Sequence, residues 1–340
     1  MTEPQPTTRS RWPHRIAVLL VCTTFPLIWV GGLVTTKKAG MAVPDWPNTY
    51  GYNLFLYPIS EWVAGPFDLF VEHGHRLLGS AVGMISIALV VAVALLDKRR
   101  WLLTLSIVSL IAVIFQGILG GARVIQDEVL LARVHGCFGP AFFALTVGLA
   151  VITSKRWDAI QAVKHTGAGR LQVLAVITAS LAYVQLLIGS FIRHVPAGGS
   201  HNDFRVAVIF HVIFAFLVAA NVIALAILAW RKFPEAIAVR RQSLFAALIV
   251  LVQIGLGVAA WTFRYGWPTF LPGRDLDPTF VIHAESVAQA GVVTAHVATG
   301  SLIVGVTVAI ALYSFRYFST SPASLVPQGA DKSTLRGVTI

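Results

Sequence analysis

The sequence predicts an all-α protein that crosses a membrane eight times. Of its 340 residues, 56% are hydrophobic and only 12% are charged, whereas an average soluble domain has about 25% charged residues. The apolar residues form eight runs, each long enough for a helix to cross a bilayer, which takes about 20 residues. These runs lie near residues 16–35, 74–96, 101–121, 134–153, 171–191, 206–230, 243–262 and 288–314.

Lys and Arg residues predict the orientation of these helices. Most of them lie before the first run and in the links after the second, fourth, sixth and eighth runs. The positive-inside rule therefore places both termini in the cytoplasm. The net charge of +11 is explained by this topology and by contact with anionic lipid, so no nucleic-acid partner is expected. An N-terminal segment without an Arg- and Ser-rich amphipathic stretch favours a bacterial cytoplasmic membrane.

Repeated segments divide the eight runs into two units of four. The Gly31-Gly32 pair is followed by Ala39-Gly40, and Gly189-Ser190 is followed at the same offset by Ala197-Gly198. The segments Gln116–Gly120 and Gln253–Gly257 also match in their first and last residues, although small residues can serve helix packing alone. We expect two pseudo-symmetric four-helix bundles related by an axis along the membrane normal, because an even number of helices preserves orientation. The expected divisions are a cytoplasmic tail at 1–15, an N-terminal bundle at 16–153, a cytoplasmic linker at 154–170, a C-terminal bundle at 171–315 and a cytoplasmic tail at 316–340.

The ends and the cysteines of the chain add little chemistry. Met1 to Ser10 and Ser319 to Ile340 have the composition of disordered tails. Cys22 and Cys137 both fall within predicted helices. Neither a disulfide framework nor a thiolate metal site is therefore expected.

Four histidines occupy matching positions in the second, fourth, sixth and eighth runs. They are His75, His135, His211 and His296, and each lies in the half of its run that is predicted to be outermost. Four residues after each histidine comes a small residue on the same helix face, namely Gly79, Gly139, Ala215 and Gly300. We expect each small residue to leave a gap for a flat macrocycle. One such histidine could be a hydrogen-bonded packing residue, but polar groups in lipid are costly, and four in matched positions indicate a function.

The number of histidines in each bundle favours haem over other metal sites. Imidazole binds zinc, copper and iron, so the ligand type does not select the metal. A tetrahedral site needs three or four converging ligands, whereas each predicted bundle offers one histidine from each of two helices. Two axial nitrogens on opposite faces of a porphyrin match that number.

Several motifs beside these histidines resemble those of the haem A synthases, which are membrane enzymes that convert haem O to haem A for terminal oxidases. The most specific is Glu72-His73-Gly74-His75-Arg76, and the others are Gly31–Thr35, Pro44–Pro47 and Gln116–Gly121. The resemblance covers about residues 16–315. It implies an oxidoreductase that oxidises the C8 methyl group of haem O to a formyl group.

The same resemblance implies cofactors and partners. His211 and His296 are expected to ligate a resident haem b, and His75 and His135 are expected to bind the substrate haem O. The expected partners are haem O synthase as a supplier, membrane lipid, the assembly machinery of a terminal oxidase, and an electron acceptor whose identity stays open.

Glu72 is the expected catalytic residue. It lies three residues before His75 on the same helical face, and a partly desolvated carboxylate can accept the protons that leave a methyl carbon during its oxidation. The alternative is that Glu72 only caps the start of its helix. His73, two residues from His75, should face the opposite way and not share its iron. Arg76 is a candidate for contact with a haem propionate.

Two further arginines, Arg123 and Arg193, are candidates for the same contact. For all three arginines the alternative is snorkelling to lipid headgroups.

The first outer loop departs from the family pattern. Many haem A synthases carry a cysteine pair there, around the Asp-Trp-Pro segment, whereas residues 43–49 of this chain contain no cysteine. A thiol-dependent step through that loop is therefore excluded for this chain.

Two other classes of function stay open from the sequence alone. A di-haem b cytochrome that transfers electrons without modifying haem would also use two histidine pairs, commonly on opposite sides of the membrane. A transporter or membrane scaffold could share a duplicated fold, but transporters frequently contain inverted repeats, and the expected repeats here are not inverted.

Overall fold

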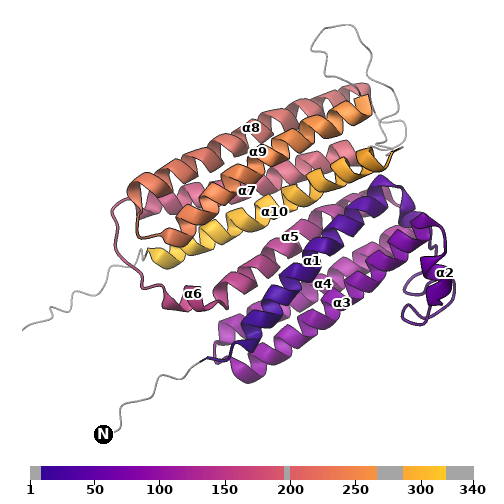
Figure 1. The fold of residues 1–340 in the computed structure, drawn as a ribbon, viewed down its shortest axis with the longest axis horizontal. Coiled ribbons are helices and arrows are strands. Elements are labelled where there is room, and N and C mark those ends of the chain that lie inside the picture. Colours follow the sequence, from indigo (N-terminus) through magenta and orange to yellow (C-terminus); the bar gives the residue numbers. More distant parts are fainter. Residues whose placement is uncertain (1–8, 195–199, 266–285, 319–340) are drawn as a thin grey trace, which may run out of the picture.

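The computed structural model describes residues 9–194, 200–265 and 286–318, and these residues form a bundle of long helices (Figure 1). Eight helices are long and apolar enough to cross a membrane, which confirms the predicted fold class. They are α1 (Trp12–Thr36), α3 (Phe67–Leu96), α4 (Arg100–Gln126), α5 (Val129–Ile152), α7 (Ala168–Arg193), α8 (His201–Lys232), α9 (Ile237–Tyr265) and α10 (Val287–Tyr317). Three short helices lie in the connections, namely η1 (Ala39–Met41), α2 (Ile59–Val63) and α6 (Lys155–Ala159).

The long helices extend beyond the apolar runs in the sequence. The second run was expected to begin near residue 74, but α3 begins at Phe67, directly after Pro66. Pro66 supplies the extended backbone from which the helix starts. Glu72 and His73 in the second turn contact the preceding loop. Glu72 lies in the second turn of α3, so the alternative that it caps this helix is wrong.

The helices contact one another in two groups of four (Figure 1). In the first group α1 packs against α3 and α5, and α4 lies between α3 and α5. In the second group α7 packs against α8 and α10, and α9 lies between α8 and α10. The relation of the two groups by an axis along the membrane normal stays a prediction.

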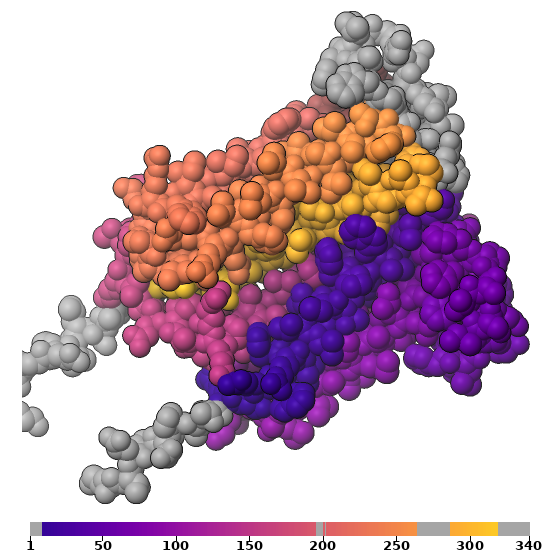
Figure 2. All heavy atoms as spheres, viewed as in Figure 1, coloured from indigo at the N-terminus to yellow at the C-terminus, as the bar shows by residue number. Residues whose placement is uncertain are grey.

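Small residues bring the two groups into close contact along α1, α5, α7 and α10. A Cβ atom on Gly305 of α10 would lie 3.0 Å from the Phe143 ring of α5, and one on Gly32 of α1 would lie 3.1 Å from Thr294 of α10. In Figure 2 the surfaces of α1 and α10 lie side by side. Close approach of this kind is how helices gain packing energy within a membrane.

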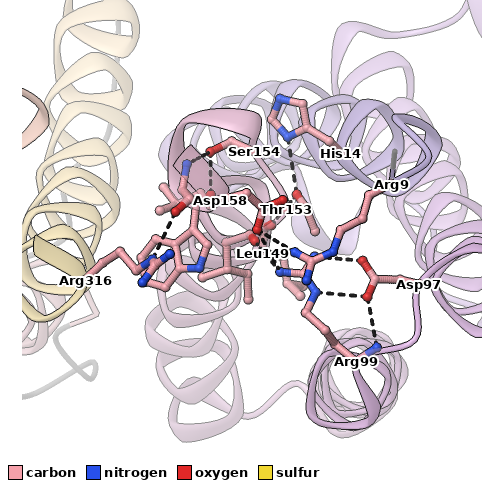
Figure 3. Close-up of polar contacts among 12 residues, drawn as sticks. Arg9, His14, Asp97, Arg99, Leu149, Thr153, Ser154, Asp158 and Arg316 are labelled. Carbon is pink, nitrogen blue, oxygen red and sulfur yellow. Dashed lines mark hydrogen bonds and ion pairs between the residues drawn. The ribbon is translucent and has the colours of Figure 1, made fainter. Parts of the chain in front are cut away.

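Ion pairs join the ends of the helices farthest from the histidines (Figure 3). Arg99 pairs with Asp97 at 2.7 Å and lies 3.6 Å from Asp158, and Arg9 pairs with Asp158 at 2.6 Å. Arg9 and Ser10 were expected to be disordered, but Arg9 is held by Asp158. The other residues that were expected to form disordered tails, 1–8 and 319–340, lie outside the described residues.

Candidate functional site

The structure brings the four histidines together as two pairs, one in each group of helices. The ring centroids of His75 on α3 and His135 on α5 are 6.4 Å apart, with an interplanar angle of 79°. Those of His211 on α8 and His296 on α10 are 6.2 Å apart, with an angle of 67°. All four histidines lie in the first half of their helices, at the same end of the bundle.

The spacing of each pair fits one iron ion between two imidazoles. An imidazole nitrogen binds a first-row metal ion at about 2 Å, so two rings on opposite sides of one ion have centroids roughly 6 Å apart. A tetrahedral site would need more ligands, and within the described residues no group of three or more His, Cys, Asp or Glu side chains converges. Both pairs therefore fit the axial ligation of a haem.

Each histidine ring packs against a glycine of the neighbouring helix. A Cβ atom on Gly31 would lie 2.8 Å from Cε1 of His75, and the corresponding distance is 3.0 Å for each of the other three pairs. Those pairs are Gly120 with His135, Gly189 with His211, and Gly257 with His296. The same ring atom faces glycine in all four cases, so the backbone of the neighbouring helix sets one common orientation for all four imidazoles.

One nitrogen of each ring faces the main chain of the neighbouring helix. Nδ1 of His75, His211 and His296 is buried beside the main-chain carbonyl groups of Leu27, Gln185 and Gln253, respectively, just outside close hydrogen-bond geometry. Nδ1 of His135 lies 3.2 Å from the carbonyl oxygen of Gln116. Nδ1 of all four rings thus faces a main-chain carbonyl group, which leaves Nε2 as the nitrogen that can bind iron.

Glutamine side chains occupy the space that was expected to hold the macrocycle in two of the four positions. A Cβ atom on Gly139 would lie 3.3 Å from Nε2 of Gln116, and one on Gly300 would lie 3.2 Å from Nε2 of Gln253. The prediction of a gap for a macrocycle is therefore wrong at Gly139 and Gly300, because each glycine makes room for a glutamine amide. Three of the four small residues are glycines, and of these only Gly79 has space around it, because a Cβ atom there would meet nothing within 4 Å.

The connection between α1 and α3 covers the N-terminal pair and is held by two residues of α3. The carboxylate of Glu72 accepts a hydrogen bond from Val43 N at 2.9 Å and pairs with Arg76 at 2.8 Å. The Arg76 guanidinium also donates to the carbonyl oxygens of Val43, Asp45 and Asn48. Both side chains are at most 9% exposed, so the ion pair is buried between the helix and the loop.

The same loop packs on α4 close to His135. A Cβ atom on Gly121 would overlap the indole of Trp46, and one on Gly40 would lie 2.8 Å from the Arg123 guanidinium. Gly121 directly follows Gly120, which touches His135, so Trp46 packs on α4 one residue from that contact. The loop of residues 37–66, here called the cover, therefore lies at the histidine end of the first group of helices.

His73 belongs to the cover and not to the histidine pair. Its Nδ1 lies 3.0 Å from Oγ1 of Thr49, and its ring contacts Tyr57 and Trp62. The prediction that His73 and His75 face opposite ways is confirmed.

Asp45 orders the turn at the tip of the cover. Its carboxylate accepts hydrogen bonds from Tyr50 N and Gly51 N, both at 2.8 Å. Burial raises the pKa of Asp45, but these two bonds and the charge of Arg76 outweigh it and leave the pKa below its usual value. Gly51 has a φ of +81°, a left-handed conformation that favours glycine.

Two of the three candidate arginines are held inside the protein by hydrogen bonds. Arg76 binds the cover, and Arg193 donates from α7 to the Gly32 carbonyl at 2.5 Å and to Oγ1 of Thr36 at 2.9 Å. The snorkelling alternative is therefore wrong for Arg76 and Arg193. Arg123 is partly buried against Gly40, close to Glu72 and Arg76.

The fold and the site define a multi-pass membrane protein with two pairs of facing intramembrane histidines, one pair beneath an ordered loop. Residues 14–271 match the family described as cytochrome oxidase assembly protein, and the chain belongs to this family. This match and the relatives below confirm the resemblance to haem A synthases that the sequence motifs indicate.

Several curated haem A synthases are similar to this chain. The protein from Shouchella clausii is 27% identical over 196 residues, which are 54% of this chain and 60% of the relative. The protein from Hyphomonas neptunium is 25% identical over 225 residues, or 56% of this chain and 62% of the relative. The protein from Listeria monocytogenes is 30% identical over 139 residues, or 40% and 43%. The chain thus spans less than two thirds of the length of each of these relatives.

Proposed function

We propose that this protein is a haem A synthase that oxidises the C8 methyl group of haem O to a formyl group. The observation that carries the proposal is the presence of two histidine pairs with centroids 6.4 and 6.2 Å apart, of which the N-terminal pair lies beneath the cover. Membership of a cytochrome oxidase assembly family and similarity to haem A synthases support the same activity. The product would serve the assembly of a terminal oxidase.

The two pairs have different roles in this proposal. His211 and His296 hold a resident haem b, because a closed pair of imidazoles binds iron tightly. His75 and His135 bind the substrate haem O, because the described carboxylate–arginine pair lies beside His75. The residues before His211 are Val208, Ile209 and Phe210, which offer no such acid. A bound haem b supplies electron-transfer chemistry, and the residues around it set its position.

Glu72 is the catalytic residue of the proposal and assists removal of protons from the reacting methyl carbon. Its carboxylate is held as an acceptor by Val43 N and by Arg76, one turn from His75. Arg76 pairs with this carboxylate and keeps the cover in place. Glu72 and Arg76 are buried between α3 and the cover, so their charges interact more strongly than they would in water.

Arginines at the histidine end would neutralise haem propionates. Arg76 is a candidate, although its guanidinium already binds three carbonyl oxygens of the cover. Arg123 forms no hydrogen bond to another described residue and faces the same site, so we propose that it makes the main contact.

The membrane setting of the proposal is the bacterial cytoplasmic membrane, with both termini in the cytoplasm. The ion-paired end shown in Figure 3 would face the cytoplasm, and the histidine end would face outward. Haem O synthase would supply the substrate, an oxygen donor such as water would supply the formyl oxygen, and an electron acceptor would receive the electrons that leave the methyl carbon.

A di-haem b cytochrome is the competing proposal, and haem analysis separates the two. The chain would be produced in cells that make haem O but no haem A, and the membrane haems would be extracted and separated. A synthase yields haem A, and His75→Ala abolishes it. If wild-type membranes contain only haem O and haem b, the electron-carrying alternative holds.

A further inference from the structure

Three of the four histidine-bearing helix pairs share a glutamine that the fourth pair lacks. Each glutamine lies four residues before the glycine that touches the histidine ring. The matched sets are Gln116 with Gly120, Gln185 with Gly189, and Gln253 with Gly257. The corresponding residue of α1, four positions before Gly31, is Leu27.

The glutamine side chain connects its own helix to the main chain of the histidine. Gln116 Nε2 donates to the carbonyl oxygen of His135, and Gln185 Nε2 donates to that of His211, both at 2.9 Å. Gln253 Nε2 reaches the same turn of α10, 3.2 Å from the position of a Cβ atom on Gly300. The hydrogen bonds of Gln116 and Gln185 therefore fix the helix turn that carries the imidazole, and Gln253 contacts the corresponding turn of α10 without a hydrogen bond to a described residue.

Two further observations separate this arrangement from ordinary packing. Oε1 of Gln116, Gln185 and Gln253 is buried without a hydrogen-bond partner among the described residues, in all three helices. Buried acceptors are rarely left unpaired. The same unpaired Oε1 at three sites indicates that each side chain is placed by its amide nitrogen, which points at the turn that carries the histidine. Gln185 Nε2 also lies 3.4 Å from Nε2 of His211. If iron binds Nε2 of His211, that contact is lost, and Gln185 keeps only its hydrogen bond to the carbonyl oxygen of His211.

His75 is the exception in both respects. Leu27 offers no hydrogen-bonding side chain, and a Cβ atom on Gly79 would meet nothing within 4 Å, where the equivalent Gly139 and Gly300 meet an amide. The turn of α3 that follows His75 is held by Arg76 to the cover, but it has no amide contact with α1 and is not filled at Gly79.

We propose that Gln116, Gln185 and Gln253 are positioning residues that fix His135, His211 and His296 as permanent iron ligands, and that His75, beside Leu27 and Gly79, is the ligand that releases iron. This inference rests on the proposed function. A resident haem needs both ligands fixed, and both histidines of the C-terminal pair have a glutamine. A site that accepts a substrate haem and discharges a product haem needs one ligand that can move away, and only His75 lacks the restraint.

Haem transfer from the full purified chain to excess apomyoglobin tests this inference, together with the spin state in the optical spectrum of the oxidised protein. The variants are Gln185→Met and Gln253→Met, which keep the side-chain length but remove the donor. Loss of orienting contacts around metal ligands typically costs 10–100-fold in affinity, so each variant should speed transfer of the resident haem by about tenfold or more. Each should also raise the high-spin fraction.

Gln172→Met is the matched control. Gln172 is a buried glutamine at the other end of α7, and its Nε2 donates across helices to the carbonyl oxygen of Phe318 at 3.1 Å. This variant loses the same kind of bond far from the histidines, so its haem transfer rate and spectrum should match the wild type.

Leu27→Gln is the converse variant, because it adds to α1 the glutamine that the other three helices have. Its expected result is slower haem transfer, whereas misfolding would speed transfer. With added haem b as the probe of the N-terminal site, transfer should show a fast phase that Leu27→Gln slows. Unchanged transfer and spin state in both glutamine variants, or an unchanged fast phase in Leu27→Gln, would overturn the inference. Wild-type haem content in His211→Ala and His296→Ala would instead overturn the proposed function itself.

Discussion

Glu72 and Arg76 form an ion pair at 2.8 Å whose partners are buried beneath the cover instead of facing lipid. The pair joins α3 to the loop above His75, because both side chains also bind main-chain atoms between residues 43 and 48. The same two residues therefore serve the structure of the site and, in our proposal, its chemistry.

Replacement of Glu72 separates these two roles. Removal of one partner of a buried ion pair costs about 3–5 kcal/mol, so Glu72→Ala should lower the thermal stability of the chain and loosen the cover. Glu72→Gln keeps an acceptor for Val43 N but loses the charge. Both variants should retain haem b and accumulate haem O or a partly oxidised product in cells. Wild-type formation of haem A by either variant, with haem b present, would contradict the catalytic role.

Gly31 should be intolerant of any side chain. A Cβ atom at this position would lie 2.8 Å from Cε1 of His75, so Gly31→Ala must push the imidazole away from its partner His135. We expect binding of added haem at the N-terminal site to weaken by about tenfold or more, as measured by optical titration. Gly83→Ala on α3 is the control, because a Cβ atom there meets nothing within 4 Å. Equal affinities in the two variants would contradict the contact.

Asp45 should make the order of the cover dependent on acid. Its pKa in the folded protein is lowered, so its bonds contribute fully above the unfolded value of about 3.9 and are lost as the pH falls through the folded value. Hydrogen-exchange protection of the Tyr50 and Gly51 amides should be constant between neutral pH and about pH 5 and should fall below about pH 4. In Asp45→Asn this acid step should be absent. An acid step that persists in that variant would assign it to another group.

The sequence was sufficient to predict the eight helices, because each apolar run meets the length that a bilayer requires. It also predicted which histidines face one another, because a costly polar residue that recurs at one depth in four helices indicates a shared role. The start of α3 was placed too far along the chain, since Asp68, Glu72 and His73 interrupt the apolar residues of its first two turns. Glu72 and His73 bind the cover.

The cover and the glutamines could not be predicted in the same way. Arg76 donates its hydrogen bonds to main-chain oxygens. Every residue has such an oxygen, so the sequence does not indicate which ones Arg76 binds. The glutamines had a signal, Gln followed four residues later by Gly in three helices, but in two of them the pattern was interpreted as an internal repeat and not as a contact with histidine. Gln185 was missed because its bond to His211 depends on how α7 and α8 pack.

The orientation of the helices can be tested directly. Cysteines introduced at Ser10 and Lys155 should be labelled by a membrane-impermeant maleimide only after the membrane is opened, whereas one at Asn53 in the cover should be labelled in intact spheroplasts. The positive-inside rule gives this expectation. Labelling of Lys155→Cys in intact spheroplasts would invert the proposed topology.

The two histidine pairs divide the work in our proposal, with a resident haem at His211 and His296 and a reacting haem at His75 and His135. The haem content of purified protein in which one pair at a time is replaced by alanine tests this division. We predict that His75→Ala with His135→Ala keeps the resident haem b and its low-spin spectrum but yields no haem A in cells. His211→Ala with His296→Ala should lose that haem. Loss of the resident haem in the first variant and its retention in the second would contradict the division of roles.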